Sequence, residues 1–171
     1  MNFKLVMTIY SCAWFSFVYL IFAYGLWFLF PKYVQIRFSR IPNIRIVTLA
    51  YQILYFIFLI FSVFISFELN IWFYAGLIIY LSGLALYISA IYYFAINEWD
   101  KAVTGGIYKL LKHPVYFGFS LIMFGISIAG QSLILFVLAV IISYLSHLIA
   151  KQEEKDCLEK YGEEYREYLA K

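Results

Sequence analysis

The chain has 171 residues, of which 65% are hydrophobic and only 13% are charged, and its net charge at neutral pH is +3. A soluble domain is roughly half apolar, so this composition excludes a soluble protein and indicates an integral membrane protein. The small charge and the lack of a polybasic run argue against nucleic acid as a partner. Cys12 and Cys157 show no CxxC spacing and no neighbouring histidine, so we expect no metal site.

Charge-free intervals predict the membrane helices, because a bilayer core of about 30 Å requires roughly 20 apolar residues and excludes unpaired charge. Three intervals are clear, at about 5–30, 46–67 and 71–96. The first is too long for a signal-peptide core, so we expect it to be retained. The third carries small residues that suit close helix packing, namely Gly76, Ser82, Gly83, Ala85 and Ser89.

The fourth interval, from His113 to Ala150, is too long for one crossing and is broken at Gly130 and Gln131. It therefore predicts a hairpin with arms at about 115–129 and 132–150. The expected fold is all-α: a polytopic membrane helix bundle of about five transmembrane helices, with a C-terminal helical hairpin and a cytoplasmic tail helix.

The lysines and arginines predict the orientation, because cytoplasmic loops carry an excess of them. Twelve of the 13 cations fall in the first connection, the third connection and the tail, which are expected on one side of the membrane. Only Lys4 falls on the other side. We expect a protein of the cell membrane with its N-terminus outside and its C-terminus in the cytoplasm.

The third connection ends in KHPVYFG, from Lys112 to Gly118, where a membrane helix is expected to begin. Pro114 suits the first turn of that helix, and the free N–H groups beside it can receive a negative group. His113 and Lys112 directly precede it. Taken alone, this pair has an ordinary alternative as interfacial side chains.

The other candidates in this connection have ordinary alternatives as well. Gly105 and Gly106 fit either a simple turn or a nest of N–H groups that holds an anion. Tyr108 and Tyr116 flank the lysine and histidine, and tyrosine at this depth is commonly an interfacial anchor.

The tail from Lys151 is densely charged, which predicts a helix outside the bilayer. One apolar stripe recurs at helical spacing, interrupted by Gly162, and consists of Leu158, Tyr161, Tyr165 and Leu169. Extending this stripe backward places Glu154 on it and turns Glu153 about 100° away. An inward-facing acid needs a cationic or hydrogen-bonding partner, and Lys112 and His113 lie on the same predicted side.

Together, VTGGIYKLLKHPVYFG (Val103 to Gly118) and EEKDCLEKYGEEY (Glu153 to Tyr165) resemble the isoprenylcysteine carboxyl methyltransferase and phospholipid methyltransferase family of integral membrane methyltransferases. The likeness covers about the C-terminal 70 residues in order, spacing and position relative to the hairpin. Lys112 stands where the family usually has arginine. The lysine keeps the positive charge but lacks the planar guanidinium that can make two parallel hydrogen bonds. Ile107 stands where proline is frequent.

The resemblance implies S-adenosylmethionine as methyl donor and a lipid or lipid-attached acceptor from the bilayer, either an isoprenylcysteine-like carboxylate or a phospholipid amine. It implies one integrated domain, in which 1–96 form the variable substrate side and 97–171 the cofactor-binding loop, hairpin and tail helix. It implies catalytic roles for His113, Tyr116 and Glu154. The implied cofactor-binding residues are Gly105, Gly106, Ile107, Tyr108, Lys112, His113, Tyr116, Glu153, Glu154 and Tyr165. Of the two acids we favour Glu154, because of the stripe.

Two other classes compete with a methyltransferase. An NADPH-dependent membrane reductase of the sterol-reductase type needs cations for phosphate, but the tail holds seven acids against five cations. A non-catalytic protein such as a transporter fragment would place ionisable groups within the spans. Here the spans hold almost none, and His147 near the end of the last span is expected to be packed or interfacial.

Overall fold

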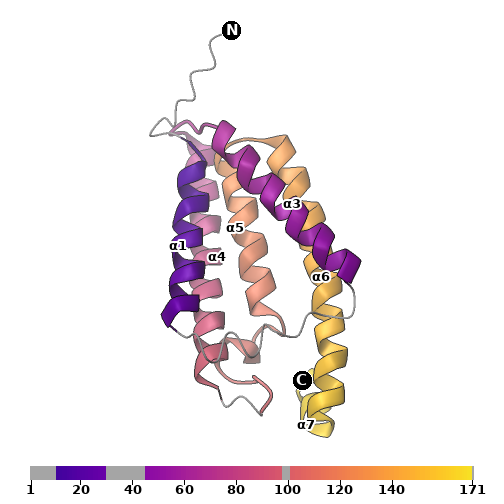
Figure 1. The fold of residues 1–171 in the computed structure, drawn as a ribbon. Coiled ribbons are helices and arrows are strands. Elements are labelled where there is room, and N and C mark those ends of the chain that lie inside the picture. Colours follow the sequence, from indigo (N-terminus) through magenta and orange to yellow (C-terminus); the bar gives the residue numbers. More distant parts are fainter. Residues whose placement is uncertain (1–10, 30–44, 98–100, 171) are drawn as a thin grey trace.

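The computed structural model describes residues 11–29, 45–97 and 101–170, and these form a helical bundle (Figure 1). Three of its helices are long and apolar enough to cross a membrane, and two shorter apolar segments accompany them. The predicted all-α membrane bundle is confirmed. In chain order the elements are α1 (Ala13–Leu29), α3 (Arg45–Phe64), α4 (Ile71–Ile96), the 3-10 helix η1 (Gly106–Lys109), α5 (Pro114–Ala129), α6 (Leu133–Tyr161) and α7 (Glu163–Leu169).

The helix boundaries follow the sequence closely at α4 and less closely at α3. Helix α4 spans the predicted 71–96, and the Asn70 side chain caps it by accepting from the N–H groups of Trp72 and Phe73. Helix α3 ends at Phe64 instead of the predicted 67. The N–H of Cys12, just before α1, donates to the carbonyl of Ile65 at 2.8 Å. The backbone at Ile65 therefore pairs with the segment before α1 and does not continue α3. The beginning and last residue of the predicted 5–30 helix lie outside the described residues.

Helices α4 and α5 pack backbone against backbone along a glycine seam. A Cβ atom at Gly76 would lie 2.4 Å from the backbone nitrogen of Ala129, and one at Gly83 would lie 2.8 Å from the carbonyl oxygen of Gly118. The role predicted for these two glycines is confirmed. Ser82 and Ala85 are exposed, so the same prediction is wrong for them.

Aromatic side chains fill the interior between α1, α3 and α5. Phe119 on α5 is buried. The centroid of its ring lies 5.5 Å from the ring centroid of Tyr19, 6.0 Å from that of Tyr51 and 5.4 Å from that of Tyr55. Helix α1 is held further by the Tyr80 hydroxyl, which donates to the carbonyl of Phe15 at 2.8 Å. Internal partners of this kind are required for polar groups that cannot reach water in a bilayer.

The hairpin turns at Gly130 and Gln131 as predicted, but its second arm does not end at 150. Helix α6 runs without a break from Leu133 to Tyr161, so the charged residues after Ala150 extend the membrane helix itself. Gly162, with φ of 58°, ends α6, and the short α7 packs beside its end (Figure 1). The predicted stripe is therefore divided between two helices at Gly162, with Leu158 and Tyr161 on α6 and Tyr165 and Leu169 on α7.

Candidate active site

The connection between α4 and α5 is shaped by Gly106. This residue has φ of 57°, and a Cβ atom there would lie 2.3 Å from the ring of Tyr93. Glycine is thus required both by conformation and by the close approach of the ring. The turn leads into η1, which packs against α4 and contains the buried Tyr108.

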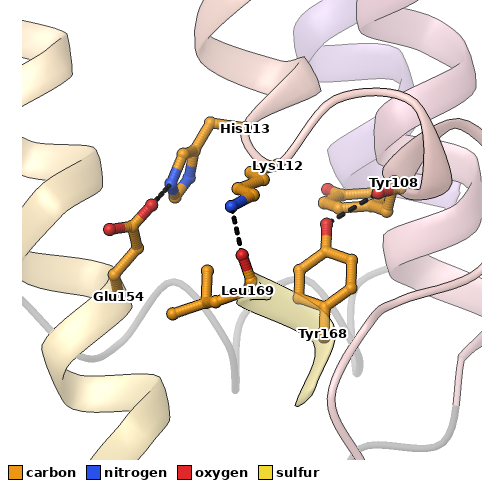
Figure 2. Close-up of polar contacts among 6 residues, drawn as sticks. All are labelled: Tyr108, Lys112, His113, Glu154, Tyr168 and Leu169. Carbon is orange, nitrogen blue, oxygen red and sulfur yellow. Dashed lines mark hydrogen bonds and ion pairs between the residues drawn. The ribbon is translucent and has the colours of Figure 1, made fainter. Parts of the chain in front are cut away.

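His113 occupies the N-cap position of α5, and Pro114 follows in the first turn, as predicted. The Nε2 atom of His113 donates to Oε1 of Glu154 on α6 at 2.8 Å (Figure 2). Their side chains are 23% and 29% exposed, so the pair is partly screened from solvent. The partner expected for Glu154 is therefore present.

Glu153 also faces α5, which corrects the expectation that it is turned away. The Tyr116 hydroxyl donates to Oε1 of Glu153 at 2.5 Å. His113 stands before the first turn of α5 and Tyr116 lies within it, so they reach α6 at different angles. Two successive residues of α6 can therefore both find partners on the same neighbouring segment.

Burial changes the acidity of Glu153, which lies in the charged extension of α6 beyond its apolar part. Removal of the carboxylate from water raises its pKa from 4.5 to about 7. The hydrogen bond from Tyr116 opposes this rise, and the nearby charge of Asp156 adds to it. Glu153 thus changes its charge near neutral pH.

Helix α7 is attached to the connection by two hydrogen bonds to backbone carbonyls (Figure 2). The Tyr168 hydroxyl donates to the carbonyl of Tyr108 at 2.7 Å, and Nζ of Lys112 donates to the carbonyl of Leu169 at 2.5 Å. Tyr165, in the same helix, is buried. Lys112, predicted to contact a cofactor, donates to the C-terminal end of α7, where a cation is favourable.

An inner cavity of about 280 Å³ lies among the connection, the start of α5, the extension of α6 and α7. Of the predicted site residues, six line it: Tyr108, Lys112, His113, Tyr116, Glu153 and Tyr165. Glu154 contacts it through His113. The backbone turn of Gly105, Gly106 and Ile107 supports Tyr108 but does not line the cavity.

Sequence reasoning missed several lining residues on α6 and α7, which are Asp156, Cys157, Lys160 and Tyr168. Those on α6 follow Glu153 by three, four and seven positions, which is the spacing of one helix face. A stripe begun at Glu153 instead of Glu154 would have found them. Tyr161 lay on the predicted stripe and also lines the cavity.

A second cavity of about 480 Å³ adjoins the first, because the two share lining residues. It is lined by polar and charged side chains of the connection and α7, among them Thr104, Lys109, Glu164 and Glu167. Three residues line both cavities, namely Tyr108, Lys112 and Tyr168. These three also make the bonds between the connection and α7.

The inner cavity combines carboxylates and a histidine with several tyrosine rings. Carboxylates accept hydrogen bonds from ammonium and hydroxyl groups, and aromatic rings stack on planar rings and attract cations. Such a lining suits a ligand that has a cationic part, hydroxyls and a planar ring.

The bundle and its cavity define a class: a polytopic helical membrane protein with a polar, aromatic site at one end. The family model described as phospholipid methyltransferase matches residues 68–164, which is more than half of the chain. The chain therefore belongs to the phospholipid methyltransferase family. No curated protein and no solved structure matches it. Membership in this family implies a membrane methyltransferase that acts on lipids.

Proposed function

We propose that the protein transfers a methyl group from S-adenosylmethionine to a lipid or lipid-attached acceptor at the cytoplasmic face of the cell membrane. The observation that carries the proposal is the pairing of His113 with Glu154 and of Tyr116 with Glu153 at the cavity. These pairs lie just beyond the apolar part of α6, where a lipid and a water-soluble donor can meet.

The lining fits the proposed donor chemically. S-adenosylmethionine carries an ammonium group, ribose hydroxyls and an adenine ring, and when bound it supplies an electrophilic methyl group on a sulfonium. Glu153 would accept hydrogen bonds from the ammonium or the hydroxyls, and Glu154 would act on the ligand through His113. Tyrosines such as Tyr108 and Tyr165 would stack on the ring or face the cation.

The protein's own task in this reaction is alignment and proton handling. Holding the two reactants in line supplies several kcal/mol of the barrier. Where the acceptor is an amine, Nδ1 of His113 would take its proton, because Nε2 donates to Glu154, and Glu154 would stabilise the imidazolium that results. Where it is a carboxylate, no base is required, and the water-poor lining favours the neutralisation of charge.

We also propose that the two halves of the chain form one integrated domain in which each half binds a different substrate. Residues 1–96 would supply the lipid side and 97–171 the donor side. The seam between α4 and α5 crosses this boundary, as do the contacts of Tyr19 and Tyr51 with Phe119, which supports a single unit.

Binding of S-adenosylhomocysteine tests the donor site. The purified protein in detergent should show calorimetric heat and a thermal shift with this ligand, and His113→Ala or Glu154→Gln should weaken binding about tenfold or more, as expected for a lost charged hydrogen bond. His147→Ala is the matched control, because His147 is exposed on α6. A thermal shift with NADPH but none with S-adenosylhomocysteine would favour the reductase alternative.

The acceptor is tested separately in membranes. Incubation with methyl-labelled S-adenosylmethionine, followed by solvent extraction, should place the label in lipid or in lipid-linked material. Label that appears only with the active chain, and not with His113→Ala, would assign the activity to this site.

A further inference from the structure

We propose that the outward face of α6 binds the phosphate group of an anionic phospholipid through His147 and Lys151. Tyr144 and Lys155 flank these two residues on the same face, and we call the four together the outer patch. The inference goes beyond methyl transfer and does not depend on it, because it concerns a lipid that is held at the edge of the bundle and does not react.

The outward face of α6 changes its chemistry along the helix. In the first part of α6 the exposed side chains of this face are apolar and recur at helical spacing, namely Leu133, Val137, Val140 and Ile141. The exposed side chains that follow on the same face are those of the outer patch. One continuous face therefore passes from apolar groups to hydrogen-bond donors, which is the order of acyl chain and headgroup in a lipid.

The outer patch has no partner within the described protein. Among the described residues, its four side chains make no hydrogen bond or ion pair. Lys151 can extend to water on its flexible stem, but the shorter imidazole of His147 begins four residues, or about 6 Å, further into the apolar part of α6. A polar group exposed to hydrocarbon is costly unless it is paired, so a headgroup that reaches His147 removes this cost.

The donors of the outer patch favour a headgroup with net negative charge. The ammonium of Lys151 and the N–H of His147 donate hydrogen bonds, and the oxygens of a phosphodiester accept them. Among the described residues, the next exposed acid along this face is Glu159, about two turns beyond Lys151. A zwitterionic headgroup also carries an ammonium, which Lys151 repels, so we expect selection for an anionic lipid.

The outer patch faces away from the candidate active site. At about 100° per residue, Lys151 lies about 160° around α6 from Glu153. Glu153, Asp156 and Lys160 line the inner cavity. A lipid bound at the outer patch therefore leaves that cavity free for its own ligand.

Lipid binding to the purified protein tests the proposal. Native mass spectrometry in detergent should show that the first molecule of dioleoylphosphatidylglycerol binds about fivefold or more tightly than dioleoylphosphatidylcholine, which has the same acyl chains. Lys151→Met and His147→Leu should each weaken binding of phosphatidylglycerol about fivefold, as expected for a lost charged hydrogen bond. Binding of phosphatidylcholine should not change, and Lys151→Arg should keep the preference.

Arg166→Gln is the matched control, because it removes one exposed cation of α7 outside the outer patch. It should keep the preference for phosphatidylglycerol. The position of the lipid is measured with phosphatidylglycerol that carries a photoreactive acyl chain, which should crosslink to the apolar part of the same face, within 133–141. Inorganic phosphate at equal concentration should not displace the lipid, because it has no acyl chains to bury.

Several outcomes would overturn the outer patch as a lipid site. Equal affinity of the wild type for the two lipids would do so, as would a preference that survives both Lys151→Met and His147→Leu. Displacement by inorganic phosphate would indicate a site for a free anion instead. Crosslinks that avoid α6, or a dimer that contacts itself through α6 and excludes the lipid, would assign this face to another role.

Discussion

Two adjacent acids of α6 have different partners and therefore different properties. Glu154 is paired with His113, and Glu153 accepts from Tyr116 and has a pKa raised by burial to about 7. The sequence predicts that Glu154 has a partner, because an inward-facing acid needs one, but it leaves both Lys112 and His113 as candidates. The pair of Tyr116 with Glu153 was not predicted. His113 stands before the first turn of α5 and Tyr116 lies within it, so the two side chains approach α6 from different angles, which helical periodicity does not describe.

Substitution of Tyr116 should change the pH dependence of ligand binding. The hydrogen bond from Tyr116 holds the pKa of Glu153 lower than burial alone would, so Tyr116→Phe should raise it further above about 7. If ionised Glu153 holds the ammonium of S-adenosylhomocysteine, affinity falls as pH drops through this pKa. The midpoint of affinity against pH, measured between about pH 5.5 and 8.5, should move upward in Tyr116→Phe. Tyr144→Phe, at an exposed tyrosine, should leave it in place.

The same carboxyl makes a prediction about stability. Its folded pKa is raised above 4.5, so the native state binds more protons than the unfolded state between about pH 4.5 and 7. Its contribution to stability therefore falls as pH rises through that window. Glu153→Gln should melt at a higher temperature than the wild type at pH 8, and the two should converge near pH 4.5. Glu159→Gln, at an exposed acid of α6, should show no such difference.

At the scale of helices, the sequence predicts the apolar segments well and their ends less well. The bounds of α4 are marked by Asn70 and by the return of charge after Ile96. The end of α3 depends on a backbone bond to Cys12, a contact between distant segments that no local pattern encodes. The extension of α6 was missed because charge marks where a helix leaves the bilayer, not where it stops.

The glycine seam should be the part of the bundle least tolerant of added volume. At Gly83 a Cβ atom meets the backbone of Gly118 and Ile122 at 2.8 Å, and backbone atoms cannot rotate away. Gly83→Val should therefore lower the free energy of unfolding by about 1–3 kcal/mol or more, measured by thermal or denaturant unfolding in detergent. Gly25→Ala on α1, where a Cβ atom meets nothing within 4 Å, should not destabilise the protein. An equal loss in both variants would contradict the role of the seam.

The whole molecule is polarised, with apolar helices along most of its length and the candidate site gathered at one end (Figure 1). The connection before α5, the extension of α6 and α7 all meet there, although they are separated in sequence by the hairpin. The likeness of motifs on both sides of the hairpin predicted this meeting. The second cavity did not follow from the motifs, because residues of α7 line it and α7 is a separate helix after Gly162.

Protease protection tests the proposed orientation. Lys155 and Lys160 are exposed on the extension of α6, so trypsin should reach them from the side that the tail faces. In sealed inside-out vesicles it should remove a C-terminal epitope tag, and in right-side-out vesicles the tag should survive. An N-terminal tag separated by a cleavable linker should give the reverse pattern. Loss of the C-terminal tag in right-side-out vesicles would invert the proposed orientation.

The unbroken course of α6 makes the protein sensitive to its lipid surroundings. At about 1.5 Å per residue, its 29 residues measure about 43 Å, well beyond a hydrocarbon core of about 30 Å. The helix that crosses the bilayer is thus the same helix that carries Glu153 and Glu154, with no break between the two parts. A thicker hydrocarbon layer draws these acids toward the headgroups, and a thinner one lifts them away. In the proposed function, bilayer thickness would therefore affect the height at which the lipid acceptor and the methyl donor meet.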